Sequence, residues 1–170
     1  VDVLADGSDP VIGVRSYGPD PALVSQLSSA RIRGMQDHGL SACAKHFPGL
    51  GAVPKDPHHH LPTVELDRDT LRTVHLAPFV SAIAAGVDTV MSSHVCYPAL
   101  ERADLPATFS STLIRGLLRQ ELGFPGVIVT DDLEMGALRE LGGIGEAAVR
   151  SVEAGHDMVL VCSSREAQAE

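Results

Sequence analysis

Residues 42–62 read ACAKHFPGLGAVPKDPHHHLP, and this stretch decides how the chain is organised. An apolar run ends in Lys45-His46, and a loop rich in glycine and proline follows that contains Asp56-Pro57-His58. Residues 126–132, GVIVTDD, have the same form, because a short apolar strand again ends in charged groups. We therefore predict that these two strand ends face one pocket, which holds cationic, imidazole and carboxylate side chains.

Strand and helix signals alternate along the whole chain. Short apolar runs predict five strands, at residues 1–5, 40–47, 87–91, 127–129 and 158–161. Helices are predicted from Pro21 to Gly39, from Asp67 to Gly86 with a break at Pro78, from Ser110 or Ser111 to Gly123, and over 144–154. Nearly continuous apolar strands that alternate with helices indicate a parallel sheet covered on both faces. We expect one domain over residues 1–170.

The first of these helices has the clearest local signals. Asp20 followed by Pro21 is typical of a helix start, because Asp accepts hydrogen bonds from the first turn and Pro suits the first helical position. Leu23, Leu27 and Met35 fall on one helical face, which we expect to face the core.

Polar residues gather where the predicted strands end. Lys45-His46, Ser93-His94 and Asp131-Asp132 all stand at such positions. Sites form at the carboxyl ends of strands in both open α/β sheets and (β/α)8 barrels, so the pattern alone does not choose between them. A closed barrel needs eight strands and roughly 250 residues. If the fold is a barrel, this chain is expected to be only part of it.

Composition and charge exclude some classes of function. The chain of 170 residues is 44% hydrophobic but only 4% aromatic, so its core must be mostly aliphatic. A net charge of −9 argues against a nucleic-acid partner, which prefers a basic face. No apolar run reaches the length of about 20 residues that a membrane span needs, and VDVLADGSDP does not resemble a signal peptide. Cys43, Cys96 and Cys162 have no metal-binding spacing and are expected to be small buried hydrophobes.

Asp131 is the first candidate for chemistry. It follows the apolar residues of the 127–129 strand, where a carboxylate is partly desolvated and its charge needs a reason. From the pattern it could be a nucleophile, a metal ligand or the cap of a helix that begins at Leu133. Asp132 is the better candidate for the capping role.

The Asp56-Pro57-His58 loop is the second candidate. A carboxylate bonded to one imidazole nitrogen fixes the tautomer and leaves the other nitrogen to move a proton. A solvated polar loop is the alternative. Metal binding by the run His58-His59-His60 is another interpretation, although adjacent histidines can rarely all face one ion.

Four further residues are candidates for the site. Lys45 and His46 should alternate in direction along a regular strand, so at most one of them is expected to face the pocket. Arg15, in a polar loop, could donate to a hydroxyl, a carboxylate or an acetamido oxygen, or could be a surface arginine. His94 could equally be a buried histidine with its hydrogen bonds satisfied.

The motifs KHFPGLG (45–51), KDPHHHLP (55–62) and GVIVTDDLEM (126–135) together resemble family 3 glycoside hydrolases of the bacterial β-N-acetylglucosaminidase type. The resemblance covers essentially the whole chain, including PVIGVRSYG (10–18) and AGHDMVLVC (154–162). KHF alone is not specific, since the β-glucosidases of the same family have it. The Asp-x-His loop, here Asp56-Pro57-His58, separates the two branches.

The resemblance implies a (β/α)8 TIM barrel and a retaining double displacement. It implies Asp131 as the nucleophile, His58 as the acid/base, and Asp56 as the residue that orients His58. Positions of the family that bind the sugar match Arg15, Lys45 and His46. No metal and no organic cofactor is implied, and the implied partner is a small carbohydrate, such as a GlcNAc-containing peptidoglycan fragment or a chitobiose-like sugar.

Two departures from the family pattern stand out. Leu50 occupies a position where the family usually has His. Measured against the family, the chain is also expected to contain only about five β/α units and to be truncated at both ends. The compartment stays open, because relatives occur in the cytoplasm and as exported lipoproteins.

The function expected from these observations is that of an exo-β-N-acetylglucosaminidase that removes terminal GlcNAc from peptidoglycan fragments. The alternatives are a β-glucosidase or a GlcNAc phosphorylase of the same family, a metal-dependent barrel hydrolase that uses His46, the 58–60 histidines, His94 and Asp131, and a non-catalytic fragment that binds sugar.

Overall fold

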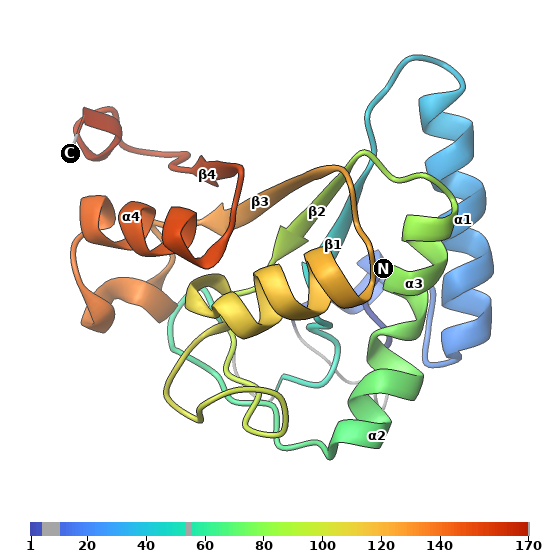
Figure 1. Ribbon diagram of the computed structural model, residues 1–170, viewed down its shortest axis with the longest axis horizontal. Coiled ribbons are helices and arrows are strands. Elements are labelled where there is room, and N and C mark those ends of the chain that lie inside the picture. The colour runs from blue at the N-terminus through green and yellow to red at the C-terminus, as the bar shows by residue number, and fades with distance from the viewer. Residues whose placement is uncertain (5–10, 54–55, 170) are drawn as a thin grey trace.

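The computed structural model describes residues 1–4, 11–53 and 56–169, and it is built on one parallel sheet (Figure 1). The strands are β1 (Cys43–Phe47), β2 (Thr89–Ser92), β3 (Val127–Asp132) and β4 (Met158–Leu160). Their order in space is β1-β2-β3-β4, and every neighbouring pair is parallel. Strand order therefore follows chain order, as it does in a (β/α)8 barrel.

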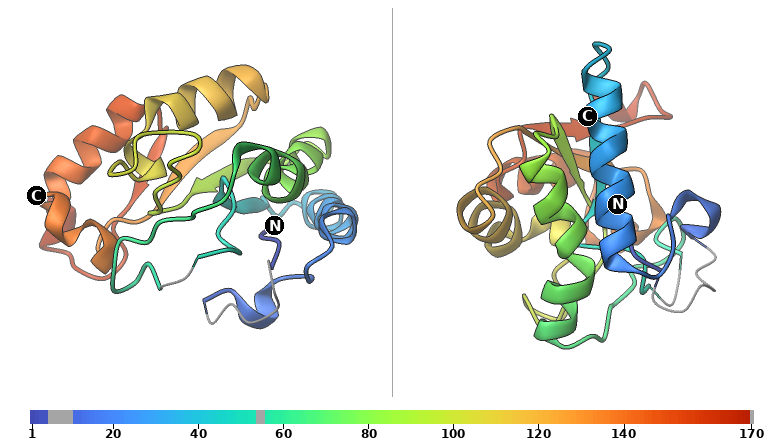
Figure 2. Two further views of the ribbon diagram at one scale, coloured as in Figure 1. Left: turned by 90° about the horizontal axis from the view of Figure 1, so that it is seen from below. Right: turned by 90° about the vertical axis from the view of Figure 1, so that its right-hand side faces the viewer.

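Helices precede β1, occupy the connections between the strands and follow β4. The longer helices are α1 (Pro21–Gln36), α3 (Ala77–Ala84), η4 (Thr112–Glu121) and α4 (Ile144–Ala154). The shorter ones are η1 (Gly13–Arg15), α2 (Arg68–Thr70), η2 (Leu71–His75), η3 (Ala107–Phe109), η5 (Gly136–Leu141) and η6 (Ala167–Ala169). Figure 2 shows the longer helices following one another in an arc around the outside of the sheet. This arrangement is part of a barrel, as the family resemblance implied, and it decides between the two α/β architectures that the strand pattern left open.

The predicted first strand is not present. Residues 1–4 have no strand pairing, and residue 5 lies outside the described part of the chain. The Val1 nitrogen nevertheless donates to the Lys45 carbonyl at 2.7 Å, so this segment runs beside β1. Its fixed position comes mainly from the Asp2 side chain described below. The other four predicted strands are confirmed, and the described residues contain four strands rather than five.

Local sequence signals correctly predicted where most helices begin and end. Asp20 accepts a hydrogen bond from the Ala22 N–H at 2.9 Å and caps α1. The helical stretch that starts after Asp67 changes at the expected point, because η2 has π-helical geometry and α3 begins at Ala77, next to Pro78. After α3, Gly86 has a φ of +78°, which glycine adopts without the penalty of a side chain.

The buried face of α1 differs from the predicted one. Leu23 and Leu27 are 41% and 39% exposed, whereas Val24, Ser28 and Ile32 are buried. Ser28 lies on the side of α1 that faces β1, because it lines the same cavity as Ala42 and Lys45. The adjacent Ser29 also donates its hydroxyl hydrogen to the Ser81 carbonyl of α3 at 3.3 Å.

The core is aliphatic, as the composition predicted. Its few aromatic residues include Phe47 and Phe79, which meet edge to face with ring centroids 5.4 Å apart. Cys96 is buried, but Cys43 and Cys162 are exposed, which corrects the expectation for these two. Cys43 is exposed because it lies on β1, an outer strand of the sheet.

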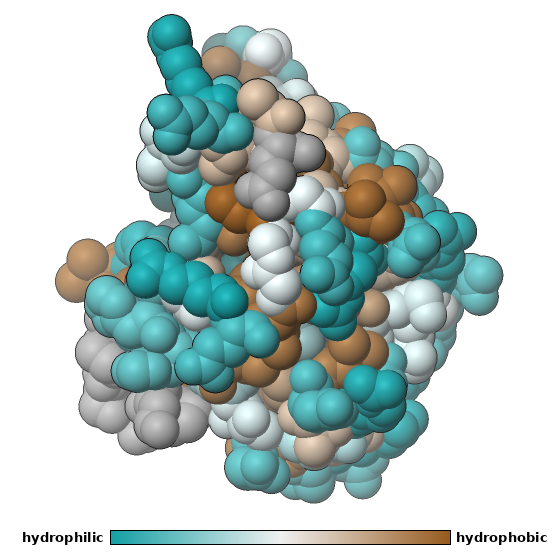
Figure 3. Space-filling view, turned by 90° about the vertical axis from the view of Figure 1, so that its left-hand side faces the viewer, coloured by the Kyte–Doolittle hydropathy of each residue, from teal (hydrophilic) through white to brown (hydrophobic). Residues whose placement is uncertain are grey.

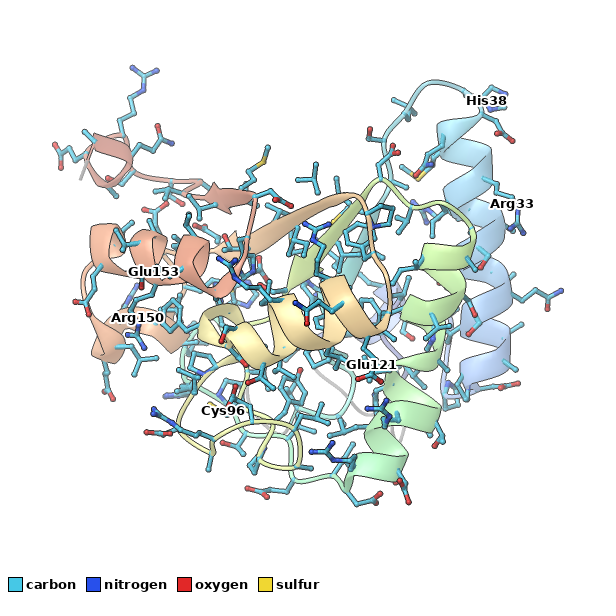
Figure 4. The ribbon with its side chains drawn as sticks, viewed as in Figure 1. Arg33, His38, Cys96, Glu121, Arg150 and Glu153 are labelled. Atoms are coloured by element: carbon cyan, nitrogen blue, oxygen red, sulfur yellow. The ribbon has the colours of Figure 1, made fainter. Side chains whose placement is uncertain are left out.

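Surface features complete the fold. Glu121 at the end of η4 forms an ion pair with Arg72 of η2 and links two neighbouring helices (Figure 4).

The side that carries α4 and the C-terminal end shows apolar patches between polar groups (Figure 3), and Val149, Val152 and Met158 are about half exposed. No described helix combines the length and the apolar character that a membrane crossing requires.

Candidate active site

Asp2 organises the end of β1. Its carboxylate is buried and accepts three kinds of hydrogen bond: from the His46 N–H at 3.1 Å, from the His46 ring Nδ1 at 2.8 Å and from the Leu50 N–H at 2.7 Å. Because a carboxylate accepts and does not donate, it holds the proton on Nδ1 of His46. The other ring nitrogen, Nε2, is then directed to Asp131, whose Oδ2 lies 3.8 Å away.

The pKa of Asp2 results from opposing effects. Burial alone would raise the pKa of this carboxyl. The hydrogen bond and charge of His46, together with the Leu50 amide, outweigh burial and hold the pKa below its usual value of 3.8. Asp2 is therefore ionised at neutral pH. Its negatively charged carboxylate fixes the orientation of the His46 ring. Sequence reasoning missed it, although a carboxylate inside the apolar run VDVL was a signal.

Asp131 and Asp132 at the end of β3 have different surroundings. The Asp131 side chain is 21% exposed and accepts from the Asp132 N–H at 2.9 Å. Asp132 accepts from the Glu134 N–H at 3.1 Å and from the Cys162 N–H at 3.3 Å, so it holds the backbone of two loops. The prediction that Asp132 caps a helix is wrong. A helix does not begin at Leu133, because residues 133–135 form a turn before η5.

His94, at the end of β2, is a buried histidine with both ring nitrogens bonded. Its Nδ1 lies 2.6 Å from the Thr108 hydroxyl and its Nε2 lies 3.0 Å from the Asp132 carbonyl. Burial lowers the pKa of His94, although the nearby charge of Asp131 acts in the opposite direction. Of the two interpretations left open, the structure favours a buried histidine with its hydrogen bonds satisfied. Through the Asp132 carbonyl, His94 holds the backbone at the end of β3.

The structure pairs Asp56 with His58. Nδ1 of His58 lies 2.6 Å from Oδ1 of Asp56, and the same oxygen accepts from the His58 N–H at 2.9 Å. That backbone hydrogen bond is the main reason why the pKa of Asp56 lies below 3.8. The His58 side chain is 59% exposed, so its ring is accessible to a ligand from solution.

The loop that carries His58 lies against the segment that follows Asp131. The Gly136 N–H donates to the His58 carbonyl at 3.0 Å, and the Ala137 N–H donates to the Pro57 carbonyl at 3.1 Å. The two predicted strand ends therefore share one edge of the sheet. Within the described part of the chain, no hydrogen bond or ion pair joins the His58 ring directly to Asp131.

A pocket of about 570 Å³ lies along the outer edge of β1, and its lining includes Arg15, Lys45 and His46. The three predicted sugar-binding residues are thus neighbours of one cavity. Arg15 also donates to the Val11 carbonyl at 2.7 Å. Lys45 and His46 both reach the pocket, contrary to prediction, because the pairing of β1 with β2 shifts register between Lys45 and Phe47. The remaining candidates, Asp131, Asp56 and His58, lie outside the described lining of this pocket.

Leu50, which stands where the family usually has His, plays an apolar role in the structure. Its side chain is buried in the apolar core, and only its backbone N–H reaches Asp2. His59 and His60 are exposed beside His58. Among residues 1–4, 11–53 and 56–169, no group of three or more His, Cys, Asp or Glu side chains is arranged to hold a metal ion.

Comparison with known proteins gives a consistent result. Over 151 residues the chain is 42% identical to a β-hexosaminidase of Stenotrophomonas maltophilia, a match that covers 89% of this chain and 44% of that protein. A β-hexosaminidase of Neisseria meningitidis serogroup B is 43% identical over 157 residues, covering 92% of this chain and 43% of that protein. The chain thus spans less than half the length of these relatives.

Solved structures agree with the sequence relatives. A family 3 β-N-acetylglucosaminidase from Paenibacillus superposes with a TM-score of 0.96 at 52% identity, covering 99% of this chain and 32% of that one. NagZ of Neisseria gonorrhoeae, solved in complex with N-trifluoroacetyl-D-glucosamine, superposes with a TM-score of 0.87 at 40% identity, covering 98% of this chain and 46% of that one. The model of the glycosyl hydrolase family 3 N-terminal domain matches residues 1–170, and the chain belongs to that family.

Proposed function

We propose that the protein containing this chain is a retaining exo-β-N-acetylglucosaminidase. The observation that carries the proposal is the arrangement at the end of β3: Asp131 lies at the strand end, and the Asp56–His58 pair is docked on the segment that follows it. The relatives named β-hexosaminidase support the same activity. Terminal GlcNAc on peptidoglycan fragments is the substrate class that we propose.

The residues can divide the chemistry of a double displacement among them. In the first step the Asp131 carboxylate attacks the anomeric carbon while His58 gives its Nε2 proton to the departing glycosidic oxygen. In the second step neutral His58 takes a proton from water, which attacks the same carbon and releases Asp131. Asp56 would hold the Nδ1–H of His58 in both steps and stabilise the imidazolium.

The β1 end would bind the sugar. Arg15 and Lys45 supply hydrogen-bond donors at the pocket, and His46 presents Nε2 between that pocket and Asp131. A histidine as acid/base leaves no carboxylate at that position to repel an anionic acceptor. Phosphate could then replace water, and one structural neighbour, a β-glucoside phosphorylase, is 27% identical with a TM-score of 0.89. Assays with and without inorganic phosphate distinguish the two acceptors.

The test of the nucleophile compares Asp131→Ala with the unaltered protein, both as the full-length protein that contains this chain. Release of p-nitrophenol from the β-GlcNAc derivative should exceed release from the β-glucoside, and Asp131→Ala should lower kcat/KM by at least about 10³-fold, since catalytic groups of this kind carry several kcal/mol. Asp104→Ala is a matched control, because Asp104 is exposed and pairs only with Arg102 in the described structure. Undiminished turnover by Asp131→Ala would contradict the assignment, and no turnover of either glycoside by the unaltered protein would contradict the function.

A further inference from the structure

Gly136 lies five residues after Asp131, where the backbone of the 56–60 loop crosses it. Figure 2 shows the loop and the segment after β3 side by side. The Gly136 and Ala137 N–H groups donate to two consecutive carbonyls of the loop, those of His58 and Pro57, at 3.0 and 3.1 Å. These two hydrogen bonds define where the backbone of His58 sits.

The contact leaves no room for a side chain at position 136. A Cβ atom there would lie 2.5 Å from the His58 carbonyl oxygen, 3.0 Å from His59 Cα and 3.1 Å from the His59 carbonyl carbon. All three are backbone atoms, so the strain could not be relieved by rotating a side chain. Either the loop or the segment would have to move.

The segment after Asp131 is the more firmly held of the two. The Leu133 N–H donates to the Leu160 carbonyl at 2.9 Å, and the carboxylate of Glu134 accepts from the N–H groups of Ser163 and Ser164. Leu133 and Leu138 are buried in one apolar cluster. A new Cβ atom at position 136 would therefore displace the loop.

The loop would move as a unit. The N–H groups of His59 and His60 both donate to the Asp56 carbonyl, at 3.1 and 3.2 Å, and the Asp56 side chain holds both the backbone and the ring of His58. A displacement at the His58 carbonyl thus carries the whole Asp56–His58 pair with it. The pair would keep its internal geometry but change its distance from Asp131.

We infer that Gly136 is a positioning residue, which sets the distance between the His58 acid/base and the Asp131 nucleophile by docking the 56–60 loop on the strand end that carries the nucleophile. The inference rests on the proposed function. It predicts a selective defect, because proton donation depends on the position of His58 while attack by Asp131 does not. A displacement of about 1 Å is enough to reduce rates by about 100-fold.

The experiment measures kcat/KM of Gly136→Ala for two β-GlcNAc derivatives, since this quantity reports the step in which the leaving group departs. Phenol is a poor leaving group that needs a proton, and 2,4-dinitrophenol is a good one that does not. We expect a fall of roughly 10- to 100-fold with the phenyl glycoside and less than about 3-fold with the dinitrophenyl glycoside. His58→Ala should show the same selectivity with a larger loss.

Gly34→Ala is the matched control, because a Cβ at position 34 meets no atom within 4 Å and both substrates should be turned over normally. If Gly136→Ala does not fold, Ala137→Pro removes the N–H that bonds the Pro57 carbonyl, near the start of η5 where proline is tolerated, and should give the same selectivity. An equal loss on both substrates, or no loss, overturns the role of Gly136 while His58→Ala keeps its selectivity. Absence of selectivity in His58→Ala itself overturns the acid assignment in the proposed function and the inference with it.

Discussion

At the residue scale, Asp2 determines how the end of β1 is built. One buried carboxylate accepts from the ring and backbone of His46 and from the Leu50 amide, across more than forty residues of sequence. It thereby orients the histidine that faces Asp131. A buried anion with these partners stabilises the fold only as long as it remains ionised and bonded.

Asp2→Asn should lower the free energy of unfolding by about 3 kcal/mol at pH 7, since removing one partner from a buried charged pair leaves the other unpaired. The pKa of Asp2 is lowered in the folded protein, so its stabilising contribution is present above 3.8 and is lost as pH falls further. The difference between the two proteins, measured in urea melts, should therefore shrink below about pH 4. Asp88→Asn, at an exposed position, should show no such difference; equal stability of Asp2→Asn and the unaltered protein would contradict the role of Asp2.

The sequence allowed some site residues to be predicted and concealed others. Asp56 and His58 stand two residues apart, so their pairing is local and could be read from spacing. Asp2 bonds His46 through a contact of sequence separation 44, which no local pattern encodes. Gly136 is equally hidden, because its importance comes from the loop that crosses it.

At the element scale, β3 carries Asp131 on a strand with two different faces. Ile128 is fully buried in the main core, whereas Val127 is 37% exposed at the start of the same strand. Strand existence was predictable from the apolar run. The face of α1 was not, because Ser28 is buried there while Leu23 and Leu27 are exposed, and hydrophobic periodicity cannot recognise a buried serine.

Ile128→Ala should reduce the free energy of unfolding by about 2–5 kcal/mol, because it opens a cavity in a packed core. Val127→Ala removes two methyl groups from the same strand at a position that water already reaches, and should cost less than about 1 kcal/mol. Chemical denaturation of both variants gives the comparison. Similar losses in the two variants would mean that β3 is not packed as described.

At the scale of the whole molecule, His156 joins the end of α4 to the centre of the sheet. Its Nε2 lies 2.8 Å from the Ser92 hydroxyl of β2, and its Nδ1 lies 3.0 Å from the Ser151 carbonyl of α4. Burial lowers the pKa of His156 to about 4, with the charge of His94 acting in the same direction and the Ser151 carbonyl and Asp157 acting against it. The ring is therefore neutral in the folded protein at pH values where a free imidazole is protonated.

This difference makes the stability of the whole fold depend on pH. Between about pH 4 and pH 6.5 the unfolded chain binds a proton at His156 and the folded chain does not, so stability rises with pH over this interval and is lost as pH falls. Each pH unit contributes up to about 1.4 kcal/mol, which amounts to about 3 kcal/mol in total. His94 and His75 have lowered pKa values as well and act in the same direction.

His156→Gln keeps a polar side chain at this position but removes the group that titrates. Urea melts at pH 7.0, 5.5 and 4.5 should show a smaller loss of unfolding free energy with falling pH in the variant than in the unaltered protein, by up to about 3 kcal/mol over the interval. His38→Gln is the control, because His38 is exposed at the end of α1 and its ring bonds only the Gly34 carbonyl in the described structure. Parallel stability curves for His156→Gln and the unaltered protein would contradict a neutral buried His156, and would place the acid sensitivity of the fold at His94 or His75 instead.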